Sequence, residues 1–488
     1  MNRLSRSALA QLPQGVAPGY DPAAHGVGIL HLGAGAFHRA HQAAITDTAL
    51  AASGGDWRIA GVSLRSADLA KALAPQDGLF TLIERGAEGD RARVIGAIDR
   101  VIAARGAPEA VLGPMADPAI RIVTLTVTEK AYGIDRSGPD ADPAHPDVAA
   151  DLDSPTAPRG VLGLLVEGLR RRRAAGHVPF TVLCCDNLPE NGAMLRGGVL
   201  GFARRIDPGL ADWIAAEVAF PSSMVDRITP AATDATLTLA ARLTGVEDAA
   251  AIETEPFCQW VIEDRFAQGR PDWAAGGAIF VDDVAPYERM KLRMLNGAHS
   301  LIAYAGFIAG HALVRGAMAD PALSVLARRH IAAAAATLDP LPGIDLDAYG
   351  DELAARFANP AIAHETYQIA MDGSQKLPQR IFAPACDAQR AGQDLRPFAF
   401  ATAAWARYCM GRCEAGAHYA LRDPREAEIA AVVEAAGGDA QALVVGLLRL
   451  PGLTPEALLG GTFEAQAARI LRDMLARGMV AAIAGEAV

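Results

Sequence analysis

The sequence has no long apolar run, few cysteines and no excess of basic residues, and each absence excludes a class of protein. No stretch of about 20 uncharged apolar residues occurs, and the N-terminus lacks a signal-peptide core. We therefore expect a cytoplasmic protein that does not span a membrane. Six scattered cysteines among 488 residues suit neither a disulfide framework nor a structural zinc site. A net charge of -11 argues against nucleic acid as a partner.

One basic run needs a separate explanation. RRRR at 170–173 follows an apolar pattern of helical period and precedes Gly176. Positive charge complements the dipole at the C-terminal turn of a helix, so a solvent-facing helix end is predicted here.

The chain is long enough for two domains. Apolar residues make up 51% of its 488 residues, which allows a substantial core, but one compact unit of this length is unusual. The change from strand-rich to helix-rich patterns places a boundary near Ala285, giving a Rossmann-type domain over 1–284 and a mainly helical domain over 285–488.

The first half begins with a strand, a glycine turn and a helix. The apolar run GVGILHL (26–32) ends in GAGAF, and a helical pattern then continues to Gly54. Gly33 would permit the tight turn, Gly35 would let a pyrophosphate approach the backbone, and Phe37 is the third cofactor candidate of this turn. His38 replaces the third glycine of the usual fingerprint, so the motif alone is weak.

HRAH at 38–41 has one-turn spacing that a metal pair could use. No third ligand is apparent, so no metal is expected, and the two histidines are predicted to face phosphate or solvent.

A second apolar segment, WRIAGVSL (57–64), is followed by Arg65 and Asp68. The adenosine ribose of a bound dinucleotide lies at this point of the fold, where an acidic residue favours NAD and an arginine accommodates a 2′-phosphate. NAD is the expected cofactor, and NADP is not excluded.

The fold class predicted is α/β, with a mostly parallel sheet covered on both faces. Further buried strands are expected at 120–128 and 180–187, and LFTLIERG with ARVIGAI indicates an antiparallel insertion. Ligands bind at the carboxyl ends of such strands. That rule selects Thr126, Thr128, Glu129 and Lys130 after one strand, and Asp186, Asn187 and Asn191 after the other. The second group could instead form a turn that caps the next helix.

In the second half, KLRMLNGAHS (291–300) interrupts a long apolar helical pattern with polar residues. On an ideal α-helix His299 lies about 80° and Asn296 about 140° around from Lys291, so all three would share one side. Each alone could satisfy a structural hydrogen bond. Together they suit alcohol–ketone interconversion, with Lys291 as acid or base, Asn187 and Asn296 as donors to an oxyanion, and His299 as the group that orients the substrate.

These segments resemble a known family. KLRMLNGAHS, GAGAFHRAHQA, TLTVTEKAYG, CCDNLPENG and EPFCQWVIEDRFAQGRPDW are similar to the polyol-specific long-chain dehydrogenases, the mannitol dehydrogenase family, over about 26–382. The resemblance implies a zinc-independent enzyme whose catalytic lysine is Lys291, with Asn187, Asn296 and His299 in the roles above. It also implies proton exchange at Glu129 and substrate contacts at Asp226 and Lys376.

Within the family, MDGSQKLPQR (371–380) looks most like fructuronate reductase, also called D-mannonate oxidoreductase. Gln368 stands where the resemblance implies arginine in mannitol-oxidising members. A sugar acid needs fixed cations for its carboxylate, and Lys376 and Arg380 are the candidates. For Arg380 a surface position or a structural salt bridge is an equal alternative.

The expected function is therefore an NAD-dependent, zinc-independent oxidoreductase that interconverts D-fructuronate and D-mannonate. One alternative is a dehydrogenase for an uncharged polyol such as mannitol, with fructose as the ketone. A second is a dinucleotide sensor without turnover, because fold does not imply function. The partner is in each enzymatic case a small molecule.

Overall fold

The structure is a computed structural model that describes residues 1–135 and 138–488. It consists of two compact units, Met1–Ala285 and Pro286–Val488. In the described residues no helix is both long enough and apolar enough to cross a membrane.

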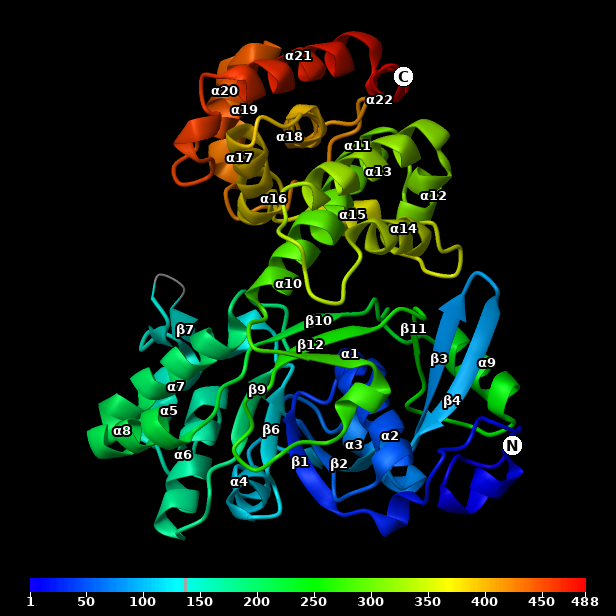
Figure 1. The fold of residues 1–488 in the computed structure, drawn as a ribbon, viewed down its shortest axis with the longest axis vertical. Helices are drawn as coiled ribbons and strands as arrows, with labels where there is room; N and C mark the ends of the chain where they lie inside the picture. The colour runs from blue at the N-terminus through cyan, green and yellow to red at the C-terminus, as the bar shows by residue number, and fades with distance from the viewer. Residues whose placement is uncertain (136–137) are drawn as a thin grey trace. The chain divides into compact units, whose positions relative to one another are not determined.

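A five-stranded parallel sheet is the centre of the first unit, as predicted (Figure 1). Its order is β5-β2-β1-β6-β9, with every neighbouring pair parallel. The strands are β1 Val27–Leu32, β2 Arg58–Ser63, β5 Ile98–Ala103, β6 Ile122–Leu125 and β9 Thr181–Cys184. The chain thus starts in the middle of the sheet and winds outward in both directions, the doubly wound topology whose switch point lies between β1 and β6.

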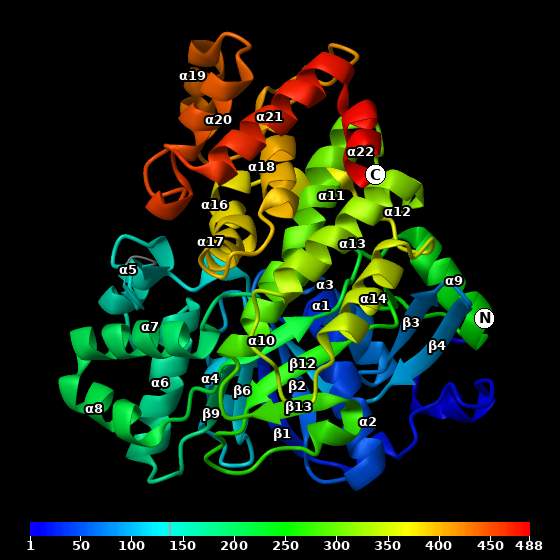
Figure 2. The same cartoon turned by 45° about the horizontal axis from the view of Figure 1, so that its top comes forward.

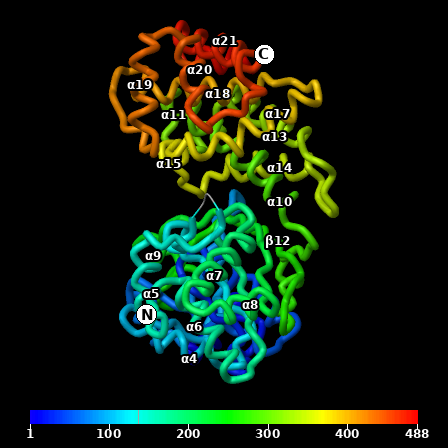
Figure 3. Tube along the Cα trace, turned by 90° about the vertical axis from the view of Figure 1, so that its left-hand side faces the viewer, coloured from blue at the N-terminus to red at the C-terminus, as the bar shows by residue number. Residues whose placement is uncertain are grey.

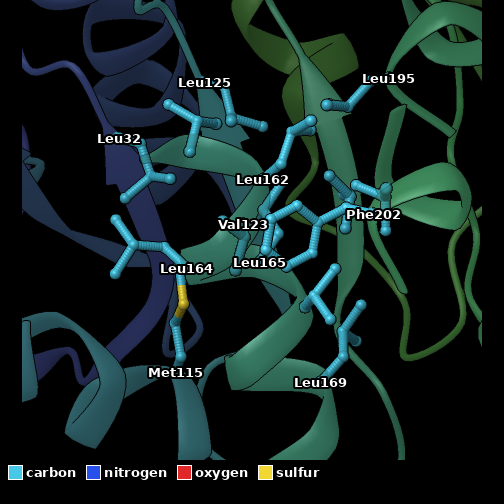
Figure 4. Packing of buried hydrophobic residues seen from close by; sticks show 14 of the residues in the cluster. Leu32, Met115, Val123, Leu125, Leu162, Leu164, Leu165, Leu169, Leu195 and Phe202 are labelled. Atoms are coloured by element: carbon cyan, nitrogen blue, oxygen red, sulfur yellow. The ribbon is translucent and has the colours of Figure 1, made fainter. Parts of the chain in front are cut away.

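Both faces of this sheet are covered, which explains why its strands are almost wholly apolar. The helices that follow the strands are α1 Ala36–Ala40, α2 Gln42–Ser53, α3 Asp68–Leu73, α4 Glu109–Ala116, α6 Val161–Ala174 and α7 Asn191–Ile206. Figure 4 shows one of the two cores: Leu32, Val123 and Leu125 of the strands pack against side chains of α4, α6 and α7. The other core joins α2 to the opposite face.

Smaller sheets complete the first unit. The predicted antiparallel insertion is β3 Phe80–Gly86 with β4 Gly89–Ile95, and β11 Ile252–Thr254 joins β3. A second small sheet contains β10 Ser223–Asp226, β12 Gln259–Glu263 and β13 Ala278–Val281. Besides short 3-10 turns, the unit also contains β7 Ile134–Asp135, β8 Asp140–Ala141, α5 Pro146–Asp153, α8 Pro208–Glu217 and α9 Asp234–Thr244.

The basic run at the end of α6 corrects one prediction. Arg172 does not face solvent; its side chain is fully buried. Its guanidinium donates to the backbone carbonyls of Met115, Asp117, Ile120 and Val178. Five fixed N–H donors let arginine satisfy several carbonyls where chain segments end together. Arg172 therefore joins α6 to the α4–β6 connection.

The second unit is helical, as predicted (Figures 2 and 3). Almost every residue of α11 is buried, because this helix packs against α13, α15 and α18. The first seven helices are α10 Ala285–Met290, α11 Gly297–Ile308, α12 Val314–Ala319, α13 Pro321–Ala335, α14 Leu346–Phe357, α15 Thr366–Ala370 and α16 Gly373–Leu377. The others are α17 Ala383–Arg390, α18 Arg396–Cys409, α19 Glu426–Ala436, α20 Ala440–Leu448, α21 Thr462–Arg477 and α22 Met479–Ala487.

Two segments of this unit are π-helical rather than α-helical. They are η6 Lys291–Asn296, between α10 and α11, and η7 Pro378–Phe382, between α16 and α17. The two segments pack against each other. Short π segments within α-helices are often found at functional sites, and these two carry three of the predicted site residues.

Candidate active site

The glycine turn after β1 has the shape that a dinucleotide requires. Gly33 has φ +96°, and a Cβ there would lie 2.2 Å from the Thr126 carbonyl oxygen, so only glycine fits. At Gly35 a Cβ would meet only the Gly33 oxygen at 3.8 Å. The space beside Gly35 is thus open, and a ligand phosphate could approach the backbone there.

The two histidines of HRAH do not face phosphate or solvent, which corrects the prediction. His38 is fully buried and its ring stacks on His31, with centroids 3.4 Å apart. His41 is also buried, and its Nε2 lies 2.9 Å from the Gln259 carbonyl oxygen. The backbone departs from helical geometry at His41, between α1 and α2, so the pattern continues as two helices rather than one.

His31 supports the glycine turn through contacts with two threonines of the neighbouring segment. Its Nδ1 lies 2.7 Å from Thr124 Oγ1 and its Nε2 lies 2.8 Å from Thr126 Oγ1. Burial lowers the pKa of His31 to about 3 and that of His38 well below its usual value, so both rings are neutral. Thr126 in turn donates its hydroxyl to the Gly33 carbonyl at 2.8 Å. Thr126 therefore helps to hold the glycine turn in its conformation.

The half-buried carboxylate of Asp186, one of the polar residues that the sequence selected at the strand ends, holds the loop after β6. Asp186 accepts hydrogen bonds from the Val127 backbone at 2.9 Å, from the Thr128 backbone and from the Tyr132 hydroxyl at 2.7 Å. Thr128 has φ +73°, an unfavourable conformation for a threonine that these bonds stabilise. Burial raises the pKa of Asp186, and the nearby charge of Glu129 adds to the effect. Glu129 itself is exposed at the start of a short 3-10 turn.

Asn187 follows Asp186 directly and is exposed at the carboxyl end of β9, where the predictions place a ligand group. Asn191, four residues on, has a structural role. Its side chain exchanges two hydrogen bonds with the backbone of Ser223, at 2.7 and 2.9 Å, and so joins the start of α7 to β10. Asp226 ends β10 and is buried.

At the end of β2, Arg65 and Asp68 are both exposed. Asp68 begins α3 and accepts a hydrogen bond of 2.7 Å from the Ser66 hydroxyl. Phe37 lies in α1 with its ring stacked on that of His41, at a centroid distance of 5.1 Å.

In the second unit, Lys291 and Asn296 are the first and last residues of η6, and His299 follows in α11. Their exposed fractions are 6%, 8% and 8%, so all three residues are almost wholly buried. The predicted angles between them need correction, because a π segment turns by less than 100° per residue. The polar residues do belong to one stretch of buried helix.

Two of these side chains carry polar atoms that lack a hydrogen-bond partner in the described residues. They are Nδ2 of Asn296 and Nε2 of His299. A buried donor or acceptor left unsatisfied costs about 1–3 kcal/mol, so such atoms are usually paired in a folded protein. A polar ligand beside η6 and the start of α11 would satisfy both atoms.

Several basic side chains lie near His299. Burial lowers its pKa well below the usual value, and the charges of His364, Arg356, Arg380 and Lys291 lower it further. The ring is therefore neutral, and it packs against Phe357 at a centroid distance of 4.4 Å.

Arg380 approaches this region from the second π segment. Its guanidinium donates long hydrogen bonds to the Asn296 carbonyl, at 3.5 Å, and to Ser300 Oγ, at 3.4 Å. Within the described residues no carboxylate forms an ion pair with it. Burial lowers its pKa to about 10. Arg380 is thus neither a surface residue nor a structural salt bridge, the two alternatives that the sequence left open.

Glycine at position 297 permits the close approach of η7 to the start of α11. A Cβ at Gly297 would lie 2.9 Å from the Arg380 carbonyl oxygen and 2.8 Å from Nε2 of the buried His330. The glycine of KLRMLNGAHS is therefore explained by the contact between η6, α11 and η7.

Lys376 lies one turn before Arg380. Its ammonium donates to the carbonyls of Met371, at 2.6 Å, and Ile369, at 3.2 Å. Burial, and next the charge of Arg380, lower its pKa to about 8. Gln368 is exposed on α15, in the preceding segment.

Two residues that the sequence did not indicate support this loop. Asp423 accepts hydrogen bonds from both the backbone N–H of Ser374, at 2.7 Å, and its hydroxyl. Asp372, two residues before Ser374, has a positive φ of +56°. Neither position has a signature in the sequence, because both depend on a contact about 50 residues away along the chain.

The fold and these residues define a dinucleotide-linked oxidoreductase, and comparison with known proteins gives the family. The model of the mannitol dehydrogenase Rossmann domain matches residues 27–275, and that of the mannitol dehydrogenase C-terminal domain matches residues 283–450. The chain belongs to the mannitol dehydrogenase family, as the sequence motifs indicated.

Two curated relatives and one solved structure illustrate the range of the family. The chain is 44% identical to D-mannonate oxidoreductase of Escherichia coli (strain K12), covering 86% of this chain and 87% of that protein. It is 42% identical to mannitol 2-dehydrogenase of Phaeosphaeria nodorum, covering 88% and 77%. The Pseudomonas fluorescens mannitol 2-dehydrogenase, solved as a ternary complex with NAD and D-mannitol, gives a TM-score of 0.84 at 39% identity, covering 99% and 98%.

Proposed function

We propose that this protein is an NAD-dependent oxidoreductase that reduces the ketone of a sugar acid, D-fructuronate, to the secondary alcohol of D-mannonate, or catalyses the reverse. Membership of the mannitol dehydrogenase family supports the general activity in this proposal, that of a dehydrogenase acting on polyols or sugar acids. The D-mannonate oxidoreductase relative favours the sugar acid, although the mannitol 2-dehydrogenases are almost as similar.

The observation that carries the sugar-acid proposal is the part-buried guanidinium of Arg380, with which no carboxylate of the described residues forms an ion pair. The charge of Arg380 also lowers the pKa of Lys376 and that of His299. A cation removed from water without an anion beside it is unfavourable, and an uncharged polyol supplies none. A substrate carboxylate would supply the missing charge, and the planar guanidinium of Arg380 can bind it with two hydrogen bonds.

The open turn at Gly33 and Gly35 fits NAD, which when bound supplies or accepts the hydride at the carbinol carbon. We assign the glycine turn with Phe37, Thr126, Thr128, Arg65 and Asp68 to the cofactor. Thr126 acts through the Gly33 carbonyl, which its hydroxyl holds at 2.8 Å.

The proton at the substrate oxygen is assigned to Lys291. In reduction its ammonium gives a proton to the oxygen as negative charge develops there, and in oxidation the neutral amine takes the proton back. The unpaired Nδ2 of Asn296 donates a hydrogen bond to the same oxygen, and Asn187 is proposed as a second donor.

His299 stays neutral, so it orients a substrate hydroxyl through the unpaired Nε2 rather than carrying charge. Glu129 is proposed to exchange protons with solvent, since its side chain is exposed. Lys376, Arg380, Asp226 and Gln368 are assigned to substrate contacts. No step in this scheme needs a metal.

The test is NADH oxidation at 340 nm with D-fructuronate and D-fructose offered to the same enzyme preparation, with a chelator in both assays. Turnover of fructuronate in preference to fructose supports the proposal. A preference for fructose would make the enzyme a mannitol 2-dehydrogenase, the runner-up. Tight NADH binding without turnover of either ketone would favour the sensor alternative.

A further inference from the structure

A second histidine lies beside His299 and has no role in the reaction proposed above. His364 stands in the segment between α14 and α15. Its ring meets that of His299 edge to face, at a centroid distance of 5.2 Å and an interplanar angle of 87°. On α14, Phe357 also packs against His299, at 4.4 Å. The His299 ring therefore contacts two other rings, and one of them is polar.

Each of the two histidine rings has a buried nitrogen that lacks a hydrogen-bond partner in the described residues. These atoms are Nε2 of His299 and Nδ1 of His364. A buried polar atom without a partner is unfavourable, so two of them in one ring contact are unusual in a folded protein. A ligand with polar groups beside these rings would satisfy both nitrogens.

The backbone of His364 is held by the segment that joins α11 to α12. Its carbonyl accepts a hydrogen bond of 2.9 Å from the N–H of Val314, the first residue of α12. Two residues further on, the N–H of Thr366 donates to the Ala312 carbonyl at 3.0 Å. These bonds restrict where the imidazole can lie before a ligand binds, which lowers the entropic cost of recognition.

Both rings are neutral, and this determines which groups they can bind. Burial lowers the pKa of both histidines, and nearby basic side chains lower that of His299 further. A neutral imidazole has one N–H donor and one acceptor nitrogen, and the tautomer decides which is which. A hydroxyl group both donates and accepts, so it suits the free nitrogen of either tautomer, whereas a carboxylate only accepts.

We propose that His299 and His364 bind two neighbouring hydroxyl groups of the sugar substrate, His299 through Nε2 and His364 through Nδ1. Because the two rings are in contact, the hydroxyls that they bind lie close together, as those on adjacent carbons of a sugar do. Arg380 is left for the carboxylate. The inference rests on the proposed function for the use of a polyhydroxy ketone, and it applies equally to a sugar acid and to an uncharged sugar.

Two replacements of His364 separate hydrogen bonding from ring packing. His364→Phe keeps a ring that can meet His299 edge to face but removes the polar atoms, whereas His364→Asn places an amide near the position of Nδ1. His311→Phe is the control, because His311 is also half-buried in the second unit and its Nε2 lies 3.9 Å from Asp320. With NADH, kcat and KM are measured for D-fructuronate and for D-fructose, and circular dichroism checks the fold of each variant.

We expect His364→Phe to lower kcat/KM by about 10- to 100-fold for both ketones, because a substrate hydroxyl loses its buried partner. The loss should lie mainly in KM, since this hydroxyl does not react and keeps its hydrogen bond from the ground state to the transition state. His364→Asn should stay within about fivefold of the wild type. His311→Phe should leave both ketones unaffected.

Wild-type activity of His364→Phe would make His364 a packing partner of His299 and overturn the proposal. Equal losses in His364→Phe and His364→Asn would also overturn it. So would a loss confined to D-fructuronate, which would assign His364 to the carboxylate. Each variant is compared with the wild type on the same ketone, so a wild-type preference for fructose overturns the sugar-acid proposal and leaves this one standing.

Discussion

Replacing Gly297 by alanine tests the contact between the two π segments. In a helix this change normally stabilises by about 0.5–1 kcal/mol, since alanine loses less backbone entropy than glycine. Here the new Cβ would lie 2.8 Å from His330 Nε2 and 2.9 Å from the Arg380 carbonyl oxygen. His330 is fully buried and the other atom is backbone, so neither can move away without disturbing its neighbours.

Overpacking of this kind costs about 1–3 kcal/mol, which exceeds the helix gain. We expect Gly297→Ala to lose about 1–2 kcal/mol of stability, or a Tm lower by about 2–8 °C for a unit of this size. The displaced oxygen belongs to Arg380, so kcat/KM for the sugar acid should also fall, by about tenfold.

The assay is thermal unfolding by circular dichroism, followed by NADH oxidation at a temperature where every variant is folded. Gly316→Ala in α12 is the matched control, because a Cβ there would meet no atom nearer than 3.8 Å. That control should be at least as stable as the wild type. A Gly297→Ala enzyme with unchanged Tm and unchanged kcat/KM would refute the close approach of η7 to α11.

Three further variants test the assigned roles. Lys291→Met should lower kcat by about 10²- to 10⁴-fold and keep the Kd for NADH, and normal turnover in a folded variant would remove that lysine as the acid and base. Asn296→Ala should lower kcat by about 10²- to 10³-fold with a smaller effect on KM; a change in KM alone would assign it to ground-state binding. Since the pKa of Lys376 is about 8, its ammonium is charged below that pH and neutral above it, so KM for fructuronate should rise above pH 8. In Lys376→Arg the KM for fructuronate should stay constant to a higher pH. If KM rises above pH 8 in this variant as it does in the wild type, the assignment is wrong.

The sequence predicts those parts of the fold that local patterns determine. The glycine turn, the buried strands and the helical second half all follow from hydrophobic period and from Gly33, whose φ of +96° only glycine adopts easily. Strand β5 was not predicted as part of the sheet. It is an edge strand whose sequence, IDRVIA, contains two adjacent charged residues and directly follows the insertion, so it resembles the end of that insertion.

What the sequence could not predict depends on contacts between distant residues. The π form of η6 cannot be read from KLRMLN, because its packing partner η7 lies about 85 residues further on. The burial of Arg172 and His38 has the same cause: their partners are carbonyls and rings contributed by other elements. For Arg380 the motif indicated a cation, but only the structure shows that no described carboxylate pairs with it.

The most direct test of the central claim is the ratio of kcat/KM for D-fructuronate to that for D-fructose, in the wild type and in Arg380→Met, with Arg472→Gln as the control. Arg472 is exposed on α21, so its loss should leave the ratio unchanged. Removing one partner of a buried charge pair costs about 2–4 kcal/mol, so Arg380→Met should lower the fructuronate value by about 30- to 1000-fold and change the fructose value little. Because no carboxylate of the described residues pairs with Arg380, the variant should be no less heat-stable than the wild type. Equal losses for both ketones, or none for either, would contradict the assignment of this cation to a sugar-acid carboxylate.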